Sequence, residues 1–151
     1  MHHDLRRAIA VERGVLTRHE YPGPAHRIDD AVKGGQLAVL FPGVYALPEF
    51  RSDFGVRAQA LLKADPRAVL TGRSAWHVAW PTGEAPKDLT AATRRLRSRP
   101  GFTFENRPIP EALVIERHGL RITSPALTAL DLVDPTGCSL DEALRLGVKL
   151  D

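Results

Sequence analysis

The feature that most constrains this chain is a pair of sharp breaks that isolate a polar run near the N-terminus. Pro22-Gly23-Pro24 precedes the run Ala25–Lys33, and Gly34-Gly35 follows it. Proline suits the first turn of a helix, where its missing N–H is no loss, and glycine adopts the left-handed conformation that ends one. Ile28 and Val32 are four residues apart and share one face. The sequence therefore predicts a short amphipathic helix over residues 25–33.

A second short helix, over residues 18–21, is predicted just before the Pro-Gly-Pro break. Thr17 can accept a hydrogen bond from the first free N–H groups of this turn, and Glu20 completes a capping box. Pro22 then ends the turn, because the residue before a proline is pushed out of the α region. Further upstream, Leu5 and Ile9 trace the core face of an N-terminal helix. Helices joined by a tight corner are typical of a helix-turn-helix, whose second helix can lie in a major groove of DNA.

A β-hairpin is predicted to follow these helices. Leu37 to Phe41 has the pattern of a strand, Pro42-Gly43 turns the chain, and Val44 to Leu47 returns. Helix-turn-helix followed by hairpin is the layout of a winged-helix unit. We therefore expect a winged helix-turn-helix domain over residues 1–48.

The remainder, residues 51–151, is predicted to form a small mixed helix–strand domain, so the expected fold class is α+β. Helices are expected from Asp53 to Asp65, from Ser74 to Trp80, over residues 126–133 and from Ser139 onward, and strand-like segments over residues 68–70, 102–104, 113–115 and 120–123. Trp76 and Trp80 lie four apart on one predicted helix, which favours core packing over base stacking. The last predicted helix has no clear end signal before Asp151. A fragment, a truncated gene and a naturally short product would all show this pattern.

Charge and cysteine content narrow the classes of function. The net charge is +3, but residues 1–50 carry six basic and six acidic side chains, whereas residues 51–110 carry eleven basic against five acidic. Cys138 is the only cysteine, which excludes an intrachain disulfide and a cysteine zinc cluster and suits the reducing cytoplasm. No apolar run approaches membrane-spanning length, so we expect no membrane contact.

The predicted DNA-contacting set follows from the helix of residues 25–33, the hairpin and the basic run after Thr93. It comprises Arg18, His19, His26, Arg27, Lys33, Phe41, Arg94, Arg95 and Arg97. Arg27 is the best base-reading residue, because a guanidinium can grip guanine through two hydrogen bonds. Phe41 could reach a minor groove or a partner protein, although ordinary packing of the hairpin against the second domain is favoured. The arginines of residues 94–99 fit phosphate contacts and a solvated loop about equally well.

Signals for catalysis are weak in this sequence. His2-His3 is at best an adventitious metal site, and His77 and His118 have no nucleophile close in sequence. No acidic residue is followed two positions later by lysine, the pairing with which restriction-type nucleases hold a metal. There is also no P-loop and no dinucleotide fingerprint. We therefore predict a protein that is not an enzyme and that needs no cofactor or metal.

Three separated motifs resemble the actinobacterial AbiEi-like family of winged-helix antitoxins and regulators. They are Gly43-Val44-Tyr45, the segment from Ala68 to Ala75, and Thr123-Ser124-Pro125 continuing to Leu132. The resemblance covers residues 5–147 and implies a repressor of its own promoter in a type IV toxin–antitoxin operon. Many members of the family continue into a nuclease-like domain of the very-short-patch-repair type. Relatives usually have a basic wing, where this chain has Leu40-Phe41-Pro42.

The expected partners are double-stranded DNA, a cognate toxin and, for a palindromic operator, a second copy of the chain. Two alternatives stay open. The chain could be an interaction protein that neutralises its partner by contact and binds DNA weakly, which the neutral N-terminal segment and the uncharged wing favour. It could also be a truncated nuclease-family protein without its catalytic domain.

Overall fold

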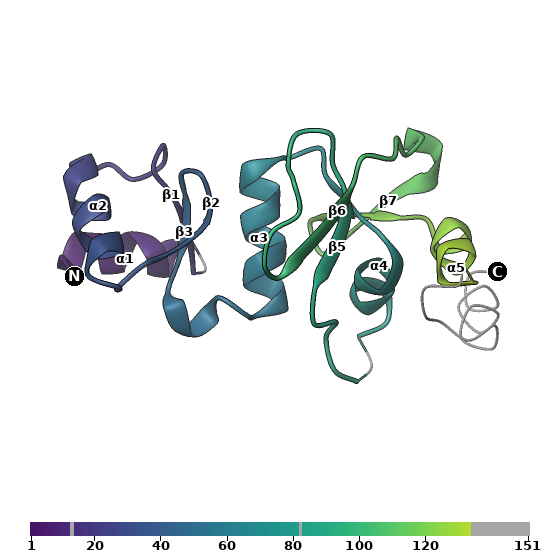
Figure 1. Cartoon of the computed structure of the whole chain (residues 1–151), viewed down its shortest axis with the longest axis horizontal. Helices are drawn as coiled ribbons and strands as arrows, with labels where there is room; N and C mark the ends of the chain where they lie inside the picture. Colours follow the sequence, from purple (N-terminus) through teal and green to yellow (C-terminus); the bar gives the residue numbers. More distant parts are fainter. Residues whose placement is uncertain (13, 82, 134–151) are drawn as a thin grey trace. The chain divides into compact units, whose positions relative to one another are not determined.

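The computed structural model describes residues 1–12, 14–81 and 83–133. The chain divides into two compact units, Met1–Pro66 and Arg67–Asp151. Each described unit contains both helices and a β-sheet, so the predicted α+β class is confirmed (Figure 1). Among the described residues, none of the helices has the length and apolar content needed to cross a membrane.

The first unit places a three-stranded sheet among three α-helices. Its elements are α1 (His3–Val11), β1 (Val15–Thr17), α2 (Ala25–Lys33), β2 (Ala38–Phe41), β3 (Val44–Ala46), the 3₁₀ helix η1 (Pro48–Phe50) and α3 (Phe54–Ala64). The sheet order is β1-β3-β2, and both pairs are antiparallel. The bounds of α2 agree with the prediction, and β2 and β3 form the predicted hairpin.

The predicted helix over residues 18–21 is wrong. Val15–Thr17 is strand β1, paired with β3, and residues 18–20 form a turn. The predicted cap survives in part, since the Glu20 N–H donates to Thr17 Oγ1 at 3.1 Å. The Glu20 carboxylate accepts instead from Lys63 Nζ of α3, at 2.7 Å. Pairing with β3 uses the backbone of residues 15–17, so the few residues left before the Pro-Gly-Pro corner form a turn and not a helix.

The division between the units falls after Pro66, later than the boundary predicted at residues 48–51. The cause is α3, which contacts all three strands of the first sheet. Asp53 caps this helix by accepting from the Val56 N–H at 2.9 Å. Its buried side chains include Val56, Ala58 and Leu61. Helix α3 therefore belongs to the first unit, although the sequence placed it in the second.

The second unit is built on a mixed five-stranded sheet. Its elements are β4 (Val69–Leu70), α4 (Gly72–Ala79), β5 (Leu89–Ala92), β6 (Phe102–Glu105), the 3₁₀ helix η2 (Glu111–Leu113), β7 (Val114–Arg117), β8 (Leu120–Thr123) and α5 (Pro125–Val133). The strand order is β6-β5-β4-β8-β7. The pairs β5–β6 and β4–β8 are parallel, while β4–β5 and the hairpin β7–β8 are antiparallel.

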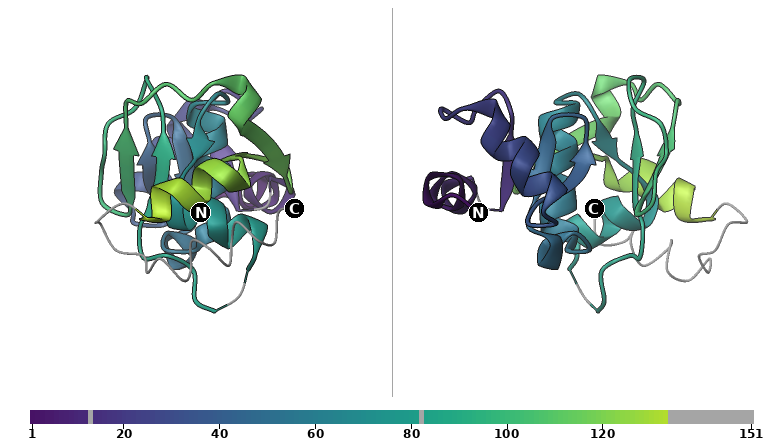
Figure 2. Two further views of the ribbon diagram at one scale, coloured as in Figure 1. Left: turned by 90° about the vertical axis from the view of Figure 1, so that its right-hand side faces the viewer. Right: turned by 60° about the vertical axis from the view of Figure 1, so that its left-hand side comes forward.

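Helices α4 and α5 pack together, and α4 also contacts β5 and β8 (Figure 2). Leu132 of α5 is buried against Trp76 and Trp80, which confirms core packing for the two tryptophans. Helix α4 begins earlier than predicted, with Thr71 at its N-cap, because the hydroxyl of Ser74 is engaged by the Thr90 N–H at 2.8 Å. The helix predicted from Ser139 lies outside the described residues.

The hairpin strand β2 offers a matched pair of substitutions for testing the core of the first unit. Phe41 is fully buried, whereas Val39 is 51% exposed. Phe41→Ala should lower the free energy of unfolding by about 3–5 kcal/mol, because it removes a buried ring and leaves a cavity. Val39→Ala should cost about 1 kcal/mol or less. Urea unfolding followed by circular dichroism measures both, and equal losses would contradict the observed burial.

Candidate nucleic-acid interface

Helix α2 is held by its apolar face and ends in a defined cap. Ile28 and Ala31 are buried in one cluster with Leu5 and Ile9 of α1. Gly35 has a φ of +74°, its N–H donates to Val32 O, and the next N–H, of residue 36, donates to Ala31 O. These two bonds form a Schellman cap, which requires the left-handed conformation that glycine adopts without strain. The opposite face of α2 is left for solvent.

The exposed face of α2 carries the polar side chains that the sequence predicted. His26 and Lys33 of the predicted DNA-contacting set are exposed, together with Asp29 and Asp30. His19, in the turn before the corner, is also exposed. The face thus holds Lys33 and a histidine beside two carboxylates, and the carboxylates would repel phosphate unless they are neutralised.

Asp29 is neutralised by Arg18. The Arg18 guanidinium donates to Asp29 Oδ1 and to the hydroxyl of Tyr45, the latter at 3.0 Å, and lies 5.9 Å from the centre of the Tyr45 ring. The hydrogen bond from Arg18 lowers the pKa of the Asp29 carboxyl. The same pairing raises the pKa of Arg18, with Tyr45 as the second cause. Arg18 therefore ties the turn after β1 to α2 and β3, which is a different role from the predicted DNA contact.

Arg27, the predicted base-reading residue, is also paired. Its Nη1 atom lies 3.3 Å from Asp4 Oδ2, and its side chain is 29% exposed. Asp4 stands in the first turn of α1 and contacts the neighbouring His3 as well. A guanidinium that reads a base must first exchange this carboxylate for the base edge. Arg27 can therefore contact a base only if its ion pair with Asp4 breaks.

Phe41 has no exposed surface and cannot contact DNA in this conformation. We therefore remove it from the predicted DNA-contacting set. Its burial agrees with a packing role, which the sequence favoured over DNA contact. At the hairpin, Pro42 and Val39 are exposed instead, and neither carries charge.

The basic run Arg94–Arg99 lies in the second unit, in the loop that joins β5 to β6. Arg94, Arg95 and Arg97 are exposed, whereas Arg99 is half-buried. Because β5 and β6 are parallel, this loop must carry the chain back along the sheet before β6 begins. Ser98 Oγ fixes the loop by accepting from the Phe104 N–H at 2.8 Å. The loop is thus anchored, with three arginines directed to solvent.

Two basic residues were missed by the sequence interpretation. Arg6 and Arg7 of α1 are exposed and lie on either side of the buried Leu5 and Ile9 face. The 3.6-residue periodicity of α1 was the available signal, since it directs both arginines to solvent. Their charge adds to that of Lys33 within the first unit.

The N-terminus contains one group of potential metal ligands within the described part of the chain. Donor atoms of His2, His3 and Asp4 lie within 4.8 Å of one another, and all three residues are exposed. His2 already serves as the N-cap of α1, accepting from the Asp4 N–H at 3.2 Å. This arrangement fits the predicted adventitious site and not a closed structural centre.

Comparison with protein-family models finds no matching family, and comparison with curated proteins finds no match. Family membership therefore remains a prediction that rests on the three quoted motifs.

The Arg18–Asp29 pair gives a pH-dependent prediction. Arg18→Ala should raise the pKa of Asp29 toward about 3.9, the ordinary aspartate value, because it removes the main cause of the lowering. In the unchanged protein, the pair stabilises the fold above that ordinary value, and its contribution is lost as pH falls through the lowered pKa of folded Asp29. An NMR titration of the Asp29 carboxyl carbon measures this pKa.

Tyr45→Phe is the matched control for this titration, since it removes one acceptor of Arg18 and keeps the ion pair. The Asp29 pKa should then stay low. An Asp29 pKa that is unchanged in Arg18→Ala would show that the ion pair does not form in solution.

Proposed function

We propose that the first unit is a winged-helix module that binds double-stranded DNA through α2, and that the chain is a transcriptional repressor of antitoxin type. The observation that carries this proposal is the connectivity α1-β1-α2-β2-β3 with sheet order β1-β3-β2, which leaves one polar face of α2 exposed. A helix followed by a hairpin is suited to placing the helix in a major groove and the hairpin beside the backbone. The family resemblance supports the same function.

Within this proposal the side chains have distinct roles. Lys33 and His26 contact phosphates or bases directly, because both are exposed on α2. Arg27 reads a base edge after it leaves Asp4. Arg94, Arg95 and Arg97 supply sequence-independent phosphate contacts from the second unit. No catalytic role, metal or cofactor is assigned, and the single cysteine supports a cytoplasmic location.

A second candidate is an antitoxin that acts by protein contact and binds DNA weakly. The observation that favours it is the internal pairing of charge in the first unit, where Arg18 and Arg27 are both engaged by carboxylates. Residues 1–66 hold nine basic against eight acidic side chains, so little positive charge remains for phosphates.

Salt dependence distinguishes the two candidates. Fluorescence anisotropy with a labelled duplex from the upstream region of the gene, at two salt concentrations, measures the affinity. A DNA-binding protein should lose affinity steeply as salt rises, because phosphate contacts release condensed counterions. If the chain does not bind the duplex even at low salt, the repressor proposal is overturned and the protein-contact candidate remains.

Lys33 gives a direct test of the α2 face. Lys33→Ala should weaken binding uniformly across sequences and reduce the slope of log affinity against log salt by about 1, as expected for one lost phosphate contact. Arg117→Ala is the control, since Arg117 is exposed on β7 of the second unit and is not in the predicted set. Equal effects of the two substitutions would indicate nonspecific attraction.

The Arg27–Asp4 pair allows a double-mutant cycle. Arg27→Ala should cost about 1–3 kcal/mol of binding free energy and relax preference at one base pair. Asp4→Asn should strengthen binding, because it releases Arg27, and that gain should vanish when Arg27 is already alanine. If Asp4→Asn strengthens binding even when Arg27 is alanine, the gain comes only from removing the repulsion between the Asp4 carboxylate and DNA. Anisotropy on the same duplex measures all four proteins.

A further inference from the structure

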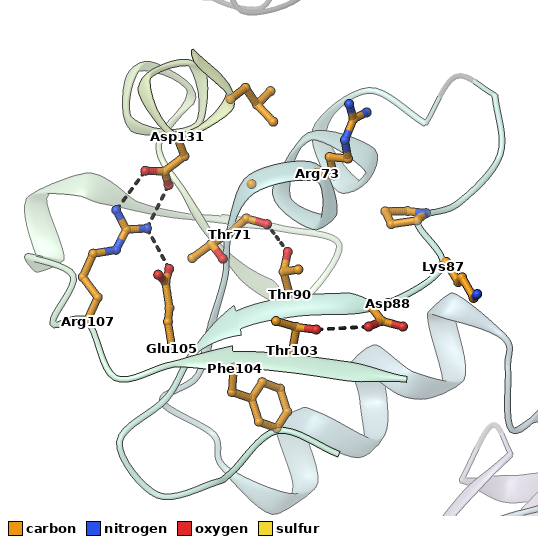
Figure 3. A pocket seen from close by; sticks show the side chains of 13 residues that line it. Thr71, Arg73, Lys87, Asp88, Thr90, Thr103, Phe104, Glu105, Arg107 and Asp131 are labelled. Carbon is orange, nitrogen blue, oxygen red and sulfur yellow. Dashed lines mark hydrogen bonds and ion pairs between the residues drawn. The ribbon is translucent and has the colours of Figure 1, made fainter. Parts of the chain in front are cut away.

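The second unit contains an open cavity of about 620 Å³, and several of its polar side chains bond to one another. Arg107 donates to both oxygens of Asp131 at 2.8 Å and to Glu105 at 2.9 Å (Figure 3). Thr103 donates to Asp88 at 3.0 Å. A ligand of this cavity would have to replace bonds that the protein makes within itself. The first unit, by contrast, presents a cation that needs no such exchange.

This cation is Arg7 of α1, which is exposed and has no side-chain partner among the described residues. Arg18, Arg27 and Lys63 of the same unit each pair with a carboxylate. Asp4 lies three residues before Arg7, a spacing at which the two side chains can meet on a helix. Asp4 is instead held by Arg27, at 3.3 Å. The charge of Arg7 is therefore available to an external anion.

Arg7 and its neighbour Arg6 lie on different sides of α1. Arg7 and Asp4 line a groove together with residues 22–23, in the corner that leads into α2. The Asp4–Arg27 ion pair joins this side of α1 to α2 (Figure 1). Arg6 lines a separate groove, with residues of η1 and α3. Arg7 is thus on the side of α1 that faces the corner and α2, and Arg6 is on the side that faces η1 and α3.

The carboxylates in the groove of Arg7 limit what it can bind. Glu12 and Glu20 line the same groove, and they lie 3.5 and 2.7 Å from Lys63 Nζ. Two carboxylates share this one ammonium, so their end of the groove keeps a net negative charge. A phosphate placed deep in the groove would be repelled there. The contact is therefore limited to one phosphate at the rim, beside Arg7.

We propose that Arg7 contacts a single DNA backbone phosphate beside the major groove that α2 enters. This inference rests on the proposed DNA-binding function. In helix-turn-helix proteins the helix before the recognition helix crosses the DNA backbone, and α1 is the α-helix that precedes α2 here. A phosphate contact carries no sequence information, but it fixes the register of the protein on the duplex. Arg7 is thus a positioning residue for α2.

A double-mutant cycle between protein and DNA tests this contact. Duplexes from the upstream region, each with one neutral methylphosphonate in place of one phosphate, are measured by fluorescence anisotropy. At one position the neutral group should weaken binding of the unchanged protein and have no further effect on Arg7→Ala. Arg7→Ala should also reduce the slope of log affinity against log salt by about 0.9, and Arg7→Lys should keep the slope. Alanine favours the helix at this exposed position, so Arg7→Ala should fold.

Arg6→Ala is the matched control, because it removes the same charge from the other side of α1. Its salt slope should equal that of the unchanged protein. Equal slope changes in Arg6→Ala and Arg7→Ala would overturn the inference, as would the absence of any methylphosphonate position that depends on Arg7. If Lys33→Ala lowers the slope and Arg7→Ala does not, α2 binds DNA without this contact and only the inference fails. If no duplex is bound even at low salt, the DNA-binding proposal fails as well.

Discussion

The apolar cluster that buries one face of α2 is the interaction on which the first unit depends. A helix of nine residues is too short to persist alone in water, so its conformation depends on the burial of Ile28 and Ala31. These side chains join Leu5 and Ile9 of α1 and Tyr45 of β3 in one cluster. The polar face of α2 is exposed because the other face is committed to this cluster. The proposed DNA contact thus follows from apolar packing, and the charges act on a helix already in place.

Local signals predicted the position and bounds of α2, and long-range pairing explains what they missed. The bounds of α2 follow from Pro24 and from the two glycines after Lys33, and both signals are local. The partners of Arg18 and Arg27 are not local, since Tyr45 and Asp4 lie 27 and 23 residues away. Sequence reasoning therefore could not tell that Arg18 pairs with Asp29 and that Arg27 pairs with Asp4.

The difference between local signals and long-range pairing also explains which parts of the fold were predicted. The α5 start and the β7–β8 hairpin were predicted because Ser124-Pro125 and His118-Gly119 act within a few residues. The helix predicted at residues 18–21 failed because β1 pairs with β3, and the sequence gives no sign of that pairing. The order of the second sheet and its cavity were not predictable for a related reason. Thr71, Glu105 and Asp131 line one cavity, although they come from three widely separated segments of the sequence.

The measurement that tests the central claim most directly is an NMR titration of the ¹⁵N-labelled chain with the upstream duplex. The account predicts saturable shifts of the α2 amides, from Ala25 to Lys33, with the largest changes at the exposed His26 and Lys33 and small changes at buried Ile28. Shifts confined to other elements, or no saturable shift at low salt, would contradict the claim that α2 is the DNA-reading surface.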